Sequence, residues 1–156
     1  MAPTINVDSI IHGGLGELYI TVNNKRYSLA NAINVSAQID KNKVAVPILG
    51  KIMQANKSAG ASGSGTMTLH YNTSVLRKLM INYIKTGRDF NATLQITNND
   101  PSTKIGRQTT ILYGVNFDSM IIAQLDTEAD YLQEDIAFTF DDADLPQSFS
   151  ALAEMN

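Results

Sequence analysis

The chain of 156 residues has no cysteine, no tryptophan and only two histidines. Without cysteine it cannot form a disulfide scaffold, a thiol nucleophile or a cysteine-ligated zinc site. His12 and His70 alone cannot supply a three-histidine metal site within one chain. No apolar run approaches the roughly 18 residues of a membrane-spanning helix. The first residues lack a basic region followed by an apolar stretch, so no signal peptide is visible and we expect a cytoplasmic origin.

Basic residues are absent from the last third of the chain. All twelve Lys and Arg lie between Lys25 and Arg107, which gives a formal charge of +7 up to residue 107 and −10 beyond it. Such opposite poles have three uses: the halves neutralise each other within the fold, the basic half binds nucleic acid, or the poles drive head-to-tail self-association. Head-to-tail contacts build rings or filaments rather than two-fold dimers. Nucleic-acid binding is the weakest of the three, because the basic residues are scattered and not interleaved with aromatic ones.

The hydrophobic pattern predicts a mainly β (α+β) fold in one domain, residues 1–156. Residues 17–29 are expected to form a hairpin that turns at Asn23 and Asn24. Residues 33–40 alternate between apolar and polar side chains, which is typical of a half-covered strand. Further strands are expected at Thr66–Tyr71, Phe90–Thr97, Thr109–Phe117 and Tyr131–Asp141, and the apolar run Met120–Leu125 is expected to continue the third of these past a bend. Four aromatic residues of the later strands are predicted to be core: Tyr113, Phe117, Phe138 and Phe140.

One helix is predicted, at about residues 74–86. Its apolar side chains recur at helical spacing and form a single stripe, which should lie on a sheet face. The stripe consists of Val75, Leu76, Leu79, Met80, Tyr83 and Ile84. The polar residues 72–74 can cap the start of the helix, and Gly87 suits the left-handed position after its end.

Three segments are expected to lie outside this core: an N-terminal arm at 1–13, an acidic C-terminal tail at 142–156, and an extended stretch at about 41–63. The stretch combines lysines, an apolar run and a tract rich in Gly, Ser and Ala. Some 20 residues without clear structure are uncommon in a small domain and are usually functional or mobile. Because the apolar run Val44–Leu49 has too few local partners to bury itself, we predict an arm or extended hairpin that finds its partner on another subunit.

No catalytic constellation is present in the sequence, so we expect a protein that is not an enzyme and holds no metal or cofactor. The tract Gly60–Gly65 lacks the lysine of a phosphate-binding loop. Two acidic clusters, at 126–130 and 141–144, lack the glycine and glutamate spacing of an EF-hand and are expected to be solvated turns. The alternatives to a structural protein are an enzyme and a ligand-binding, lectin-like β-sandwich, the latter favoured if aromatic residues gather on an exposed face.

The outward faces of the predicted strands carry small and polar side chains. These are Asn34, Ser36, Gln38 and Asp40; Asn116 and Asp118; and Gln133, Asp135, Ala137 and Thr139. They form either an ordinary solvated sheet face or the inner wall of a tube. A wall of short, mildly acidic side chains offers no apolar grip and repels phosphates, so nucleic acid could pass along it without sticking.

Several segments, taken in order and spacing, resemble the tail tube proteins of contractile phage tails, in particular the tube subunits of PBSX-type defective prophages. The segments are Gly65–Leu69, Asn82–Gly87, Tyr113–Ser119, Leu125–Asp126 and Ile136–Asp142. The likeness runs from about Gly14 to about Phe149. It implies a β-sandwich or open barrel with a flanking helix, in which six copies form a ring and the inner sheets join into one β-barrel. Rings would stack into the rigid inner tube of a phage tail or an R-type bacteriocin particle, inside a contractile sheath.

The resemblance also implies partners and roles. The expected partners are other copies of the chain, the tail sheath protein, baseplate and tail-terminator proteins, a tape-measure protein in the lumen, and transiting DNA in a true phage, with no membrane binding. The polar residues above, except Ala137, are expected to face the lumen. Ring stacking and other inter-subunit contacts are expected from Lys41, Lys43, Val44, Val46, Ile48, Leu49, Lys51, Lys57, Asp126, Glu128 and Asp130. The subunit would be made in the host cytoplasm, and phage and bacteriocin remain open alternatives.

Overall fold

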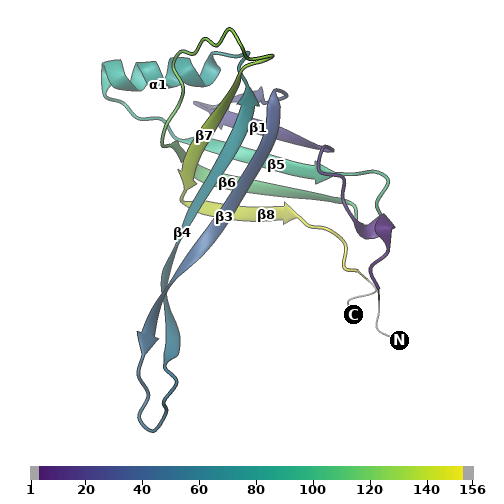
Figure 1. The fold of residues 1–156 in the computed structure, drawn as a ribbon, viewed down its shortest axis with the longest axis vertical. Coiled ribbons are helices and arrows are strands. Elements are labelled where there is room, and N and C mark those ends of the chain that lie inside the picture. Colours follow the sequence, from purple (N-terminus) through teal and green to yellow (C-terminus); the bar gives the residue numbers. More distant parts are fainter. Residues whose placement is uncertain (1–3, 153–156) are drawn as a thin grey trace.

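The computed structural model describes residues 4–152, which contain eight antiparallel strands, one α-helix and a short 3-10 helix at Val7–Ser9 (Figure 1). The strands are β1 (Gly16–Val22), β2 (Lys25–Ser28), β3 (Ala32–Val46), β4 (Ala55–His70), β5 (Ala92–Asn99), β6 (Arg107–Phe117), β7 (Gln133–Phe140) and β8 (Asp142–Gln147), and the helix is α1 (Val75–Thr86). Their spatial order is β2-β1-β5-β6-β7-β4-β3, with β8 paired to β6. The predicted mainly β fold with one helix is confirmed.

The strands form two layers that share β6. Sheet A contains β2, β1, β5, the first part of β6, and β8, whereas sheet B contains β3, β4, β7 and the last two residues of β6. Figure 1 shows the sheet B strands running steeply across those of sheet A. Between the layers lies a core of fifteen buried apolar residues drawn from both sheets and the helix. The architecture is therefore a β-sandwich whose layers are joined by a single bent strand.

The bend in β6 occurs at Gly114, which has a φ of +64°. A Cβ atom there would collide with the carboxylate of Asp141, so the position requires glycine. The bend also changes which side chains face the core: Leu112 is buried before it, and Val115 and Phe117 are buried after it. The prediction that Tyr113 belongs to the core is therefore wrong, and its side chain is 39% exposed on the outer face of sheet A.

Helix α1 matches its predicted position and closes one end of the sandwich. Gly87 adopts a left-handed conformation at its C-terminus and donates its N–H to the carbonyl of Tyr83. Leu76, Leu79 and Met80 pack against the core, whereas Tyr83 and Ile84 at the end of the predicted stripe stay exposed. No helix within residues 4–152 is long and apolar enough to cross a membrane.

The stretch 41–63 is not an irregular loop, because the tract at 58–65 is part of strand β4. Glycine is needed in this strand: a Cβ atom on Gly63 would meet the ring of Phe140, and one on Gly65 would meet the ring of Phe138. The two rings cover the glycines from β7, the opposite strand, which compensates for their missing side chains. Only residues 47–54 at the tip of the β3–β4 hairpin lie outside the strands. The stretch therefore forms the distal part of a long two-stranded hairpin, and its contact with another subunit stays a prediction.

The two terminal segments dock beside each other, next to the β5–β6 connection. The His12 amide donates to Asp100 Oδ2 at 3.0 Å, and the Ser150 amide donates to the Ile105 carbonyl at 2.8 Å. The Asp100 carboxylate accepts hydrogen bonds from the Ser102 hydroxyl and from the amides of His12 and Ser102. These bonds, the Ser102 hydroxyl most of all, hold the pKa of Asp100 below its ordinary value. The expected acidic tail begins instead with strand β8. Residues 1–3 of the predicted arm and 153–156 of the predicted tail lie outside the described residues.

Candidate assembly surfaces

Sheet B places its predicted outward residues on one face, opposite the core. Register puts Asn34, Ser36 and Gln38 of β3 beside Thr68, Thr66 and Ser64 of β4, and these beside Asp135, Ala137 and Thr139 of β7, with Asn116 of β6 next to Thr139. The same face continues with Asp40 of β3 and Gln133 of β7. Asp118 also belongs to it, because it lines a shallow hollow together with Ser36 and Gln38. We call this surface the polar face. Every residue that sequence analysis assigned to a lumen lies on it, and its facing a lumen stays a prediction.

Strand β4 adds residues that sequence reasoning did not assign to the polar face. They are Ser62, Ser64, Thr66, Thr68 and His70, which alternate with the core-side residues Gly63, Gly65, Met67 and Leu69. The first two were missed because the tract at 58–65 was predicted to be irregular. The signal that could have found them is the alternation of Ser with Gly, which keeps the period of a strand.

The polar face is rich in hydroxyl groups and carries charge of one sign only. Its ionic side chains are Asp40, Asp118 and Asp135, with no Lys or Arg among the described residues that form it. The Thr68 hydroxyl donates to Asp135 Oδ1 at 2.7 Å, and the Gln38 amide donates to Asp40 at 3.2 Å. Short, mutually bonded polar side chains with a mild negative potential repel anions and hold nothing apolar.

The distal part of the β3–β4 hairpin forms a basic arm, residues 41–61. Toward the tip of the hairpin, the pairing of β4 with β7 ends at Gly63. The arm therefore projects beyond the sheet as two strands without a third (Figure 1). All eight hairpin residues predicted to make inter-subunit contacts are exposed: Lys41, Lys43, Val44, Val46, Ile48, Leu49, Lys51 and Lys57. At the tip, Leu49 and Ile52 are fully exposed, at 102% and 105%. Ile52 and Met53 were missed because no periodicity distinguishes them.

The three predicted acidic contact residues lie far from this arm. Asp126, Glu128 and Asp130 occupy the connection between β6 and β7, where Asp126 accepts the Glu128 amide at 3.0 Å. Figure 1 shows this connection beside α1, at the end of the long axis opposite the hairpin tip. Within one subunit the structure therefore separates these three acidic residues from the lysines of the basic arm rather than pairing them. The expectation that the two halves neutralise each other internally does not hold for these residues.

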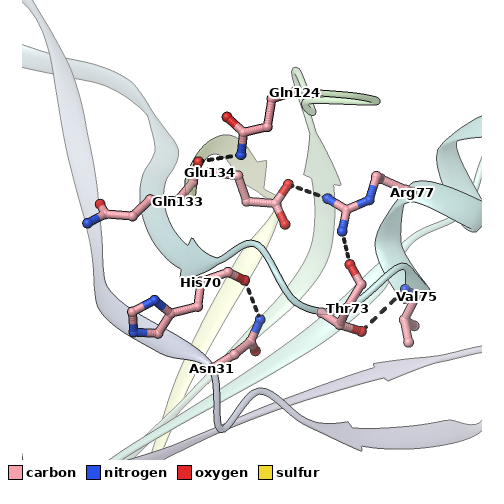
Figure 2. A network of polar contacts seen from close by, with 8 residues as sticks. All are labelled: Asn31, His70, Thr73, Val75, Arg77, Gln124, Gln133 and Glu134. Carbon is pink, nitrogen blue, oxygen red and sulfur yellow. Dashed lines mark hydrogen bonds and ion pairs between the residues drawn. The ribbon is translucent and has the colours of Figure 1, made fainter. Parts of the chain in front are cut away.

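A buried ion pair joins the helix to sheet B near the acidic end (Figure 2). Arg77 Nη1 lies 2.8 Å from Glu134 Oε2, the Arg77 guanidinium stacks 4.1 Å from the ring centre of Tyr71, and Nη2 donates to the Thr73 carbonyl. Both charged residues are buried, so each depends on the other for compensation. Sequence reasoning missed the pair because nothing in the local pattern links residues 57 positions apart. The pair therefore fixes the helix against sheet B rather than taking part in a reaction.

Solved structures that share this fold come from contractile injection systems and phage tails. A chain in the sheath–tube complex of the extracellular contractile injection system PVC, in its extended state, superposes with a TM-score of 0.67 at 14% identity, over 91% of this chain and 94% of that one. The SPP1 tail tube superposes with a TM-score of 0.63 at 8% identity, over 94% of this chain and 86% of that one. At these identities the likeness shows the fold alone.

The sequence itself defines the family. The family model for phage tail tube proteins matches residues 3–147, and the chain belongs to this family. A relative is protein XkdM of the phage-like element PBSX in Bacillus subtilis (strain 168), 37% identical over 146 residues, which are 94% of this chain and 97% of the relative. The predicted resemblance is therefore confirmed. Family membership gives the chain a structural role as a tail tube subunit in a tail particle.

Proposed function

We propose that six copies of this chain close into a ring and that stacked rings form the inner conduit of a contractile phage tail or phage-tail-like bacteriocin. In each ring, sheet B of one copy continues into sheet B of the next, and the polar faces together line the lumen. The single observation that carries the proposal is that the polar face occupies the sheet whose border strand β3 is long and open. A sheet edge of this kind is satisfied by pairing with another copy.

Charge supports stacking of the rings. The basic arm carries four lysines and no acid, whereas the acidic connection at the opposite end of the molecule carries Asp126, Glu128 and Asp130. When copies stack in the same orientation, the arm of one ring points toward the acidic connection of the next. The exposed tip residues Leu49 and Ile52 would be covered in the same contact, which adds apolar burial to the electrostatic attraction.

The remaining surfaces suit the other tail components. The outer face of sheet A lies on the far side of the sandwich from the polar face, so it would point toward the sheath, and the free ends of the tube would meet the baseplate and terminator proteins. The lumen would hold the tape-measure protein and, in a phage, pass DNA without specific binding, because the acidic polar face repels phosphates. The subunit would act without catalysing a reaction, and it would be made in the host cytoplasm.

Electron microscopy of the concentrated protein tests this proposal. We expect hollow tubes or six-fold rings in negative stain, and labelled subunits along the tails of particles released from induced cells. A protein that stays monomeric at every concentration and never enters a tail particle would overturn it. Particles with a DNA-filled capsid would identify a phage, whereas contractile particles without a capsid would identify a bacteriocin.

A further inference from the structure

Residues 119–125 form an apolar segment that lacks a place in either sheet. Five of the six residues from Met120 to Leu125 are apolar, a composition typical of a strand. Sequence analysis accordingly predicts that the segment continues β6. That prediction is wrong for the free subunit, in which the segment is irregular chain between β6 and β7.

The segment nevertheless follows the open edge of β7. Its start is tied by the Asp118 amide, which donates to the Ala137 carbonyl at 2.9 Å and extends the short β6–β7 ladder. Its end is tied by the Gln124 side chain, which donates to the Gln133 carbonyl at 2.8 Å (Figure 2). The chain thus advances six positions, from 118 to 124, while β7 recedes four, from 137 to 133. An antiparallel strand interrupted by two single-residue bulges, or by one larger bulge, has this excess of two residues.

The side chains of the segment are only partly satisfied. Met120 packs against the core, whereas Ile122 is 46% exposed and Leu125 is 90% exposed. On the other border of the same sheet, β3 has no partner along its outer edge within the described residues, and its Ile39 is 60% exposed. Sheet B therefore has one border strand without a partner and one border segment that is not yet a strand.

We propose that residues 119–125 are a latent strand, which becomes ordered as the border of sheet B when β3 of a second copy pairs with it. The inference rests on the proposed ring assembly and assigns the contact within it. A sheet of about four strands is too narrow to curl and pair its own borders, so the partner lies on another chain. A second copy fits because its β3 is a long border strand without a partner on its outer edge within the described residues. Pairing in this way continues both the backbone ladder and the polar face from copy to copy.

Amide hydrogen exchange of the wild-type chain, free and in assembled tubes, measures this directly. We expect residues 119–125 to exchange rapidly in the free subunit and at least roughly a hundredfold more slowly in the tube. The connection at 100–104, which is already bonded in the free subunit, should change little and serves as the internal reference.

Proline substitutions provide an independent measurement. Ile122→Pro and Ala123→Pro each remove one backbone donor on alternate sides of the segment, and neither amide makes a backbone hydrogen bond among the described residues of the free subunit. At least one should raise the concentration needed for assembly roughly tenfold while leaving the melting temperature of the free subunit unchanged. Ile122→Ala, which keeps the donor, is the matched control and should have the smaller effect.

The outcomes separate this inference from the proposed function. Tubes in which residues 119–125 exchange as fast as in the free subunit, or both proline variants assembling like the wild type, would overturn the latent strand and leave the tube intact. Wild-type protein that forms no tube or ring under any condition would overturn both. Slow exchange in the tube together with a proline-sensitive assembly is the result that we expect.

Discussion

The borders of sheet A are protected, and the borders of sheet B are open. Strand β2 is four residues long and carries Lys25 and Arg26, which lie over the rings of Tyr27 and Tyr19 at 5.1 and 3.9 Å. Strand β8, at the other border, contains Pro146 and two aspartates. Short edges, charges and proline are the devices that stop a sheet from pairing with another chain. Strand β3 has fifteen residues and uses its lysines only in the projecting arm.

The difference shows that edge protection is applied selectively. A single subunit could have blunted all its borders, yet only the layer without the polar face is blunted. Sheet B also contains the glycines that lie beneath Phe138 and Phe140, and its interior strands bury Met67, Leu69 and Ile136 on the core side. Its openness is therefore confined to its borders. We infer that sheet A stabilises the subunit and that sheet B joins subunits.

Filling the space beneath an aromatic ring should have the largest effect on the subunit itself. Gly65→Val would drive a side chain into the ring of Phe138 and the carbonyl of Ser36, and we expect it to lower the free energy of unfolding by about 3 kcal/mol. The neighbouring Ser64→Val, which points to the polar face, should change it by less than about 0.5 kcal/mol. Urea unfolding measures both. Equal losses would mean that sheet B is not packed through these glycines.

A charge on the open border should stop assembly without unfolding the subunit. Ile39→Lys places a lysine on the exposed part of β3 and should raise the concentration needed for assembly at least roughly tenfold, which is about 1.4 kcal/mol. Ser28→Lys, on the protected border strand β2, is the matched control and should assemble normally. Sedimentation or light scattering distinguishes them. Similar inhibition by both lysines would remove the distinction between the two borders.

Reversing the charge of the acidic connection between β6 and β7 should have a smaller effect, and this effect should fall on the stacking of rings. The double variant Asp126→Lys/Glu128→Lys should weaken assembly by about 1 kcal/mol, roughly fivefold, and the loss should shrink at high salt. Because both residues are exposed, the melting temperature of the free subunit should not change. Asp142→Lys/Asp144→Lys makes the same charge change on β8 and should assemble normally. Altered melting with unchanged assembly would refute the stacking role.

The smallest effect is expected at the docked termini, which flank sheet A. The pKa of Asp100 is lowered from its ordinary value of 3.8, chiefly by the Ser102 hydroxyl, so the folded state holds this carboxylate ionised. Its contribution to stability is present above that value and is lost as the pH falls through the lower pKa of the folded state. Wild type should therefore lose more stability than Asp100→Asn on acidification into this range. If the wild type and Asp100→Asn lost stability in parallel on acidification, Asp100 would make no such contribution.

Much of the fold could be predicted because the relevant signals are local. The helix has its own apolar stripe and a glycine after its end, and the inward residues Ile136 and Phe138 of β7 alternate without interruption. Asn23 and Asn24 adopt the positive φ expected of a tight hairpin turn. In each case a few neighbouring residues determine the conformation.

The misjudged elements depend on partners distant in sequence. Gly63 and Gly65 of the glycine-rich tract lie beneath Phe138 and Phe140 of β7, a contact that no local pattern announces. Gly114 changes the facing of β6 through a bend that alternation does not reveal. The polar face was predicted from three strands, but Ser62 and Ser64 of β4 were lost with that tract. The Arg77–Glu134 pair has no local signature, since its two halves meet only after the sheets have packed.

Labelling of single cysteines tests most directly whether the polar face lines a tube, because the chain has no cysteine of its own. Thr66→Cys lies on the polar face within the interior strand β4, and Tyr113→Cys lies on the outer face of sheet A; both positions are exposed in the free subunit. With a bulky polyethylene-glycol maleimide, we expect both to react in the free subunit but only Tyr113→Cys to react in assembled tubes. Equal reactivity of Thr66→Cys before and after assembly would contradict the central claim.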